Sequence, residues 1–460
     1  MKIYLQIAIA TLFSTTLIAQ NECTCEQVFD KMIEKLEANY IAYHITKNEI
    51  SSAYEMQKQK YNTLIKNTPI SDCVKTLQGF LDFFKDGHLF VVEFPKFPEE
   101  ELIKHKAFIK ENAIDIKNIS PGNKKSIEGY WTDGESKFAI IKNNNLQIKE
   151  EYIAVIIDTK DKTKIGEIKF EVSFSNNKWE GTYYTNTYTP RYVNITPYKD
   201  NNLLNIWGGI LWGRLDSKDA AMYNPVSPNI KSLDKQTIVM TIPSFLIEKK
   251  DFDKVLNDNE TLFENAENLI IDIRGNSGGN GIYFNLLRYY YEKPALSGRG
   301  WAISSDDNIA YFQRFVRNNS NDPYAPVVAE MQENKGKLVK GPIFQPLELE
   351  AKKTNIKKVV ILTDRGNMSA AETFILYSKA VSNKVITMGE HTGGVVDYNN
   401  VNMIPLNCEK QGIHFGYPTY TLHDKIPKEG YNKTGILPDI RIKNNVKDKI
   451  AFIINQLEKY

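Results

Sequence analysis

The strongest constraint on the fold is a regular alternation of apolar runs and amphipathic segments from Gln236 to the end of the chain. The runs NLIIDI, KKVVILT and KVITMGE are short and apolar, as strands buried on both faces are. Between the runs lie segments such as DFDKVLNDNETLFENA, NGIYFNLLRYYYE and AAETFILYSKAVS, which we expect to be helices. The alternation predicts an α/β core of stacked βαβ-like units, in which ligands bind at turns that follow the strands.

The rest of the 460 residues predicts further domains. Residues 1–20 have the layout of a secretory signal peptide, with one lysine, an apolar stretch and small residues. Residues 21–98 have apolar positions at helical spacing and predict an N-terminal helical segment. Residues 99–232 hold short alternating runs such as KFAIIK and YIAVIID between turn residues, and predict an inserted antiparallel β domain. Residues 233–460 form the α/β core and end in a C-terminal helix.

Composition and charge limit which binding partners and which cellular compartment are expected for this protein. The formal charge is +2 and both signs are interleaved, which gives no support to a nucleic-acid partner. The signal-peptide layout predicts an exported protein, periplasmic or secreted, and no later segment is long and apolar enough to span a bilayer. Export exposes cysteines to oxidising conditions, and we expect Cys23 or Cys25 to pair with Cys73. Zinc-site spacing is absent, and we expect neither metal nor cofactor. The sequence does not indicate the oligomeric state.

The tetrad Ser369-Ala370-Ala371-Glu372 follows a predicted buried strand and opens a predicted helix. It fits the capping box S-x-x-E, which satisfies the first amides of a helix. The same place suits a nucleophile, because the helix dipole stabilises the negative charge that develops there and the N–H of Ala370 points toward an oxyanion. The tetrad taken alone favours capping and leaves catalysis open.

The stretch DIRGNSGGNG, residues 272–281, follows another predicted strand and is rich in glycine. One interpretation is that Gly278 or Gly279 offers a free N–H to an oxyanion. A second is that Gly275–Gly279 forms a G-x-S-x-G nucleophile elbow around Ser277, as in an esterase. The terminal Lys-Ser/Thr of a phosphate-binding loop is missing.

Asp86-Gly87-His88 precedes a short predicted strand. A tight D-G turn accounts for this spacing without any chemistry. The functional interpretation makes His88 a general base, because imidazole is the side chain that titrates nearest to neutral pH.

Together the three stretches resemble the carboxy-terminal-processing (tail-specific) serine peptidase family. The resemblance is closest to its histidine branch, which includes tricorn-type and retinoid-binding-protein-like members and exported bacterial proteins. It implies a core of the crotonase or Clp-protease type and no cofactor. It also implies that Ser369 is the nucleophile and that Ala370 and Gly278, with Gly279 close behind, form the oxyanion hole. Family members commonly have proline where Ser277 stands.

The resemblance also implies which base is used. One branch of the family has a lysine in a loop that corresponds here to residues 392–398, and this loop has none. The other branch uses the histidine of a D-x-H motif, which His88 provides. That branch often has an acid three positions before the glycine of G-x-x-P-D, and here the position is Asn432. Glu429 lies nearby, so these two are the candidates for orienting His88.

These observations predict an exported serine endopeptidase that acts on proteins or peptides. The family's PDZ-like module is not evident, because the β-rich insert occupies its place, so cleavage at a tail does not follow. Two alternatives stay open. One is an esterase that uses Ser277 with His414 or His423, and the other is a non-catalytic peptide- or ligand-binding protein that keeps the fold.

Overall fold

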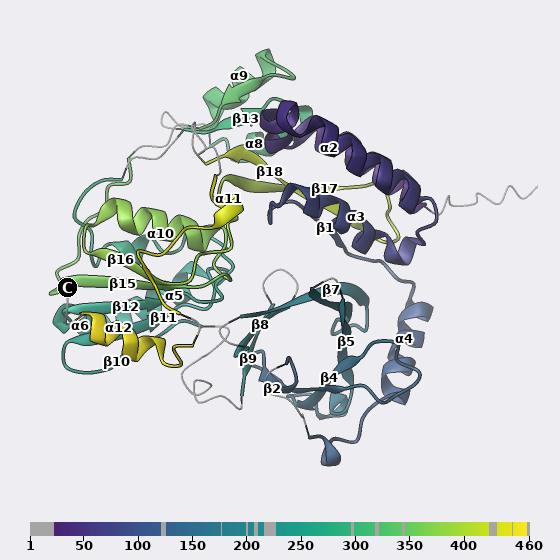
Figure 1. Ribbon diagram of the computed structural model, residues 1–460, viewed down its shortest axis with the longest axis horizontal. Coiled ribbons are helices and arrows are strands. Elements are labelled where there is room, and N and C mark those ends of the chain that lie inside the picture. Colours follow the sequence, from purple (N-terminus) through teal and green to yellow (C-terminus); the bar gives the residue numbers. More distant parts are fainter. Residues whose placement is uncertain are drawn as a thin grey trace, which may run out of the picture.

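The computed structural model describes residues 23–120, 126–175, 177–198, 201–206, 210–215, 227–295, 299–317, 322–342, 346–422, 430–443 and 445–457. The predicted signal peptide lies outside these residues. An α/β body, a β-barrel, and a set of helices packed on a second sheet are arranged around a common centre (Figure 1). The mixed α/β class and the antiparallel β insert are confirmed.

The α/β body is built on a six-stranded sheet in which every neighbouring pair is parallel except the first. In spatial order its strands are β10 (Asn229–Ser232), β11 (Thr237–Thr241), β12 (Asn268–Asp272), β15 (Lys358–Thr363), β16 (Val385–Gly389) and β19 (Ile440–Arg441). Its helices are α5 (Lys249–Asp258), α6 (Glu260–Asn265), α7 (Phe284–Leu287), α10 (Ala370–Val381) and α12 (Lys449–Leu457). The turns after β12 and β15 lie side by side because these two strands pair in parallel.

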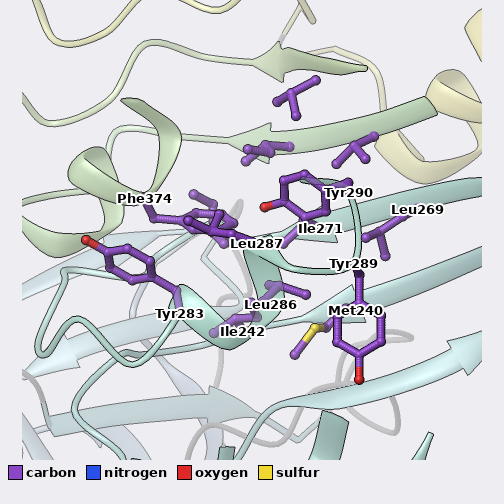
Figure 2. Close-up of a cluster of buried hydrophobic side chains, with 14 of the residues drawn as sticks. Met240, Ile242, Leu269, Ile271, Tyr283, Leu286, Leu287, Tyr289, Tyr290 and Phe374 are labelled. Atoms are coloured by element: carbon purple, nitrogen blue, oxygen red, sulfur yellow. The ribbon is translucent and has the colours of Figure 1, made fainter. Parts of the chain in front are cut away.

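The main core fills one side of this sheet. Figure 2 shows Met240 and Ile242, from β11 and its end, together with Leu269 and Ile271 of β12. Phe374 of α10 belongs to the same buried cluster, which therefore anchors the helix that begins after Ser369. Burial of such large apolar side chains is the main stabilising term of a fold of this kind.

Two predicted helices differ from the structure. The segment 251–266 forms α5 and α6, which are separated at Asn259, a residue with φ −117°. The segment 280–292 forms only the short α7, because Tyr283, Tyr289 and Tyr290 all turn into the core (Figure 2). Burial on several faces overrides helical propensity there.

The insert is a closed barrel of eight antiparallel strands, each paired with the next and the last paired with the first. The strands are β2 (Gly129–Thr132), β3 (Lys137–Lys142), β4 (Tyr152–Asp158), β5 (Ile168–Ser175), β6 (Lys178–Tyr184), β7 (Pro190–Tyr198), β8 (Leu203–Ile206) and β9 (Ile210–Arg214). Inward-facing side chains such as Trp131, Phe170 and Trp212 are buried together and fill its interior. Helix α4 (Glu99–Glu111) and the short 3₁₀ helices η3 (Ile116–Asn118) and η4 (Lys162–Lys164) accompany it.

A five-stranded sheet joins the N-terminal segment to the α/β body. Its strands are β1 (Phe90–Glu93), β13 (Trp301–Ile303), β14 (Leu338–Lys340), β17 (Tyr398–Pro405) and β18 (Ile413–Thr421). The helices beside it are α1 (Cys25–Asn39), α2 (Ile41–Ile65), η1 (Ile70–Asp72), α3 (Cys73–Leu81), η2 (Asp82–Phe84), α8 (Asp306–Gln313), α9 (Ala325–Glu333) and α11 (Gly430–Thr434). The antiparallel pairing of β1 with β18 brings the start of the chain beside residues more than three hundred positions later.

Two disulfides fasten the helical segment. Cys25 pairs with Cys73, which confirms that one of the first two cysteines bonds to Cys73, and Cys23 pairs with Cys408. Within the described ranges, no helix combines the length and apolarity that a bilayer crossing requires.

Candidate active site

Ser369 occupies a strained turn between β15 and α10. Its backbone has φ 54° and ψ −120°, a conformation that residues other than glycine rarely adopt and that costs about 1–3 kcal/mol. Two acceptors hold this turn, because the N–H of Ser369 lies 3.1 Å from the carbonyl of Val395 and 3.1 Å from Oε2 of Glu372. This turn places Ser369 directly before α10, at the positive end of the helix dipole.

His88 reaches this serine from the other side. Its Nε2 lies 2.9 Å from Oγ of Ser369, across a sequence separation of 281 residues. Its Nδ1 lies 2.7 Å from the main-chain carbonyl of Tyr398. A carbonyl only accepts hydrogen bonds, so Nδ1 carries the proton and Nε2 is left to accept the proton of the serine hydroxyl.

The turn that presents His88 is held by a buried carboxylate. Oδ1 of Asp86 accepts the N–H of His88 at 3.0 Å, and Oδ2 accepts the hydroxyl of Tyr40 at 2.8 Å. Burial raises the pKa of Asp86, and the nearby His88 opposes this change. The aspartate of the D-G-H motif therefore fixes the backbone of the histidine from within the same turn.

A second buried carboxylate, that of Glu372, joins the serine turn to the loop of residues 392–398. Glu372 is fully buried, and burial raises its pKa to about 7. Its oxygens accept four hydrogen bonds, from the N–H of Ser369, the hydroxyl of Thr392, the N–H of Gly394 and the N–H of Val395. Because the same loop ends at Tyr398, it connects the backbone of the serine to the group that orients the histidine.

The glycine-rich turn after β12 lies against the serine. A Cβ at Gly278 would come within 2.9 Å of the Ser369 Cβ and 3.0 Å of the Ala370 nitrogen, so only glycine fits there. The N–H of Gly278 donates to Oδ1 of Asn276 at 2.9 Å. Among the described residues, the N–H groups of Gly279 and Ala370 donate to no protein acceptor. The amide of Gly278 is therefore engaged within its own turn, unlike the amides of Gly279 and Ala370.

The two candidates for orienting His88 behave differently. Glu429 lies outside the described residues. Asn432 supports the loop instead, because its Oδ1 accepts the N–H groups of Val396 and Asp397 at 3.0 Å each. Among the described contacts, Asn432 makes no hydrogen bond to His88.

The esterase arrangement is not assembled in the described part of the chain. No hydrogen bond there joins Ser277 to a histidine, and Nδ1 of His414 lies 2.7 Å from the carbonyl of Gly412. His423 lies outside the described residues. The described residues also contain no group of three or more His, Cys, Asp or Glu side chains arranged to hold a metal ion.

Sequence reasoning missed the group that holds Nδ1 of His88. That group is the carbonyl of Tyr398, and every residue has a carbonyl, so no residue type announces it. Thr392 and Asp397 in the 392–398 loop are polar residues whose side chains form hydrogen bonds in the structure, but they do not identify the carbonyl that accepts from His88.

Comparison with known proteins gives one family. Residues 236–442 match the model of peptidase family S41. No curated protein matches the sequence.

Solved structures similar to this chain include three peptidases at low identity. A putative peptidase from Parabacteroides merdae has 13% identity and a TM-score of 0.41, covering 95% of this chain and 96% of that one. Mature CPAF complexed with lactacystin has 12% identity and a TM-score of 0.47, covering 95% and 98%. The photosystem II D1 C-terminal processing protease has 14% identity and a TM-score of 0.36, covering 93% and 96%.

Proposed function

We propose that Ser369 is the nucleophile and His88 the general base of this chain, a serine-type peptidase whose residues 236–442 match family S41. The single observation that carries the proposal is the 2.9 Å distance between Nε2 of His88 and Oγ of Ser369. It is a hydrogen bond of the length that general-base catalysis requires.

The proposed reaction proceeds in two steps. Oγ of Ser369 attacks the peptide carbonyl carbon while Nε2 of His88 takes the hydroxyl proton, and the carbonyl oxygen becomes an oxyanion. The carbon–nitrogen bond then breaks, and the imidazolium gives its proton to the departing amine. Water, activated by the same nitrogen, hydrolyses the acyl-enzyme and releases the serine.

We propose that the amides of Ala370 and Gly279 stabilise the oxyanion. Ala370 directly follows Ser369, and Gly279 directly follows Gly278, whose Cβ position would lie 2.9 Å from the Cβ of Ser369. Both amides are free of protein acceptors among the described residues. Gly278 contributes by its lack of a side chain, which lets the turn approach Ser369. The carbonyl of Tyr398 keeps the imidazole in the tautomer that the first step needs. Losing one oxyanion donor typically costs about 10²–10³ in rate.

The experiment that tests these roles is labelling with a fluorophosphonate probe, followed by peptide mapping of the adduct. We expect the wild type and Ser277→Ala to be labelled at Ser369, and Ser369→Ala to be unlabelled and inactive on a casein substrate. His88→Ala should lose about 10²–10⁴ of the peptidase rate while its melting temperature is retained. Labelling of Ser369→Ala, or loss of labelling in Ser277→Ala alone, would refute the assignment.

We also propose that the protein is exported. The signal-peptide layout of residues 1–20 supports this, as do the two disulfides, which persist in oxidising compartments. Cell fractionation followed by N-terminal sequencing tests it. The mature chain should begin near residue 21, and a full-length cytosolic protein with free thiols would contradict it.

A further inference from the structure

A cavity of about 730 Å³ lies between the helical segment and the barrel. The helical segment lines it with Tyr61, Ile70 and Thr76, and β7 of the barrel lines it with Arg191 and Tyr192. Glu93, at the end of β1, also lines the cavity. The volume is in the range of ligand sites in proteins.

Two strands connect this cavity with the proposed catalytic residues. Strand β1 begins two residues after His88 and ends at Glu93, five residues after His88, and its four residues span roughly 13 Å. Strand β7 runs from Tyr192 at the cavity to Tyr198, whose ring lies 3.0 Å from the Cβ position of Gly366 in the turn before Ser369. In Figure 1, β7 forms the side of the barrel that faces β1.

The cavity end of these strands is tied together. Oε1 of Glu93 accepts the N–H of Tyr192 at 2.9 Å, so the helical segment and the barrel are in contact there. A polypeptide whose scissile bond lies at Ser369, and which extends along these strands, would reach the cavity after about five residues.

The chemistry of the walls favours a polypeptide over a small anion. The nearly buried Glu180 is paired with Lys75 at 2.8 Å and accepts the hydroxyl of Tyr192 at 2.9 Å, so this charge is already neutralised. Leu64 is 50% exposed at the rim, and Tyr61 offers an aromatic surface. The ion pair, the exposed leucine and the aromatic and hydroxyl groups, together with the other charged side chains of the lining, match the mixed character of an extended peptide.

We propose that this cavity is a second contact site for the substrate polypeptide, about five residues from the bond that Ser369 attacks. The proposal rests on the proposed peptidase function. Contacts far from the reacting bond raise kcat/KM when their binding energy is used to orient the scissile bond. The barrel then has a role in choosing long, unfolded substrates over short ones.

The test compares internally quenched peptides of four residues with peptides that carry six further residues on one side or the other. For the wild type, we expect extension on one side to raise kcat/KM roughly tenfold. Thr76→Trp should fill the cavity and remove that gain while leaving hydrolysis of the short peptide unchanged. Thr63→Trp is the matched control, because Thr63 lies outside the cavity and, like Thr76, donates its hydroxyl to a carbonyl four residues earlier.

Ser71→Trp, on the exposed 3₁₀ helix at the cavity, replaces Thr76→Trp if the latter unfolds. The inference is overturned if extension brings no gain, or if both cavity variants keep the gain while cleaving the short peptide normally. The proposed function fails separately, if the wild type does not cleave the short peptide or if Ser369→Ala does. The two failures are therefore distinguishable in one set of assays.

Discussion

At the scale of single residues, Glu372 shows how burial and hydrogen bonding oppose each other. Its four donors favour the ionised carboxylate, whereas removal from water favours the protonated acid. Burial has the larger effect, and it raises the pKa of Glu372 to about 7. The carboxyl group that holds the Ser369 turn therefore changes its charge near neutral pH.

Replacing Glu372 with glutamine tests this balance through stability. The native carboxyl keeps its proton up to about pH 7, whereas an unfolded glutamate releases it near its ordinary pKa of 4.5. The native state thus binds more protons between these pH values, and the free energy of unfolding falls as pH rises through this window, by roughly 3 kcal/mol at most. Glu372→Gln cannot titrate, so its melting temperature relative to wild type should rise steadily from pH 5 to pH 7.

The control for that measurement is Glu264→Gln, which changes an exposed glutamate on α6. It shows how much of any pH-dependent change in melting temperature comes from replacing a glutamate at an exposed position. A difference for Glu372→Gln that does not change with pH would show that the buried carboxyl is not protonated in this window.

At the scale of elements, the loop of residues 392–398 aligns the two proposed catalytic groups. It accepts the N–H of Ser369 through Val395 and the Nδ1 proton of His88 through Tyr398. The side chain of Val395 also packs on Gly87, directly before the histidine. This loop therefore sets the distance between His88 and Ser369, which are 281 residues apart in the sequence.

The packing of Gly87 on Val395 gives a test with a built-in rescue. A Cβ added at Gly87 would lie 2.8 Å from Cγ2 of Val395, so Gly87→Ala should push the His88 turn away from the loop. We expect kcat to fall at least tenfold, because small displacements of a catalytic group are costly. Gly87→Ala combined with Val395→Ala should recover activity, since the second change removes the obstructing methyl groups.

Steady-state kinetics of the two single variants and the double variant decide the matter. Val395→Ala alone reports the cost of the lost packing. A double variant no more active than Gly87→Ala would show that the steric contact does not control the His88 position.

At the scale of the molecule, the site lies where separately built bodies meet (Figure 1). The α/β body supplies Ser369, the N-terminal segment supplies His88, and β17 of the five-stranded sheet supplies the carbonyl of Tyr398. The Cys23–Cys408 disulfide joins the start of the helical segment to the connection between β17 and β18.

Removing this disulfide should weaken the whole assembly. The bond closes a loop of 385 residues and restricts the unfolded chain, so replacing Cys23 and Cys408 with serine should lower the free energy of unfolding by about 2–4 kcal/mol. Thermal unfolding of the double variant and of the wild type, both without reductant, measures this. The double variant should also lose part of its peptidase rate, because the His88 segment is then fastened less firmly. Equal melting temperatures for the variant and the oxidised wild type would contradict this.

Much of the architecture was accessible from sequence because it depends on local patterns. The apolar runs at β15 and β16, and the short apolar runs between turn residues at β3 and β4, predict strands from the order of neighbouring residues alone. The β1–β18 pairing was not accessible, because register between distant strands is set by packing.

Local patterns along the chain are enough to predict the order of strands and helices in the α/β core, the positions of its turns, and the serine, histidine and glycine residues of the proposed site. The packing of distant segments is needed to show that His88 lies 2.9 Å from Ser369, that a carbonyl accepts from its other nitrogen, and that the amide of Gly278 donates to Asn276. The two differ because periodicity records the surroundings of each segment along the chain. Contacts between distant segments depend on how whole bodies pack, and main-chain donors and acceptors are the same in almost every residue.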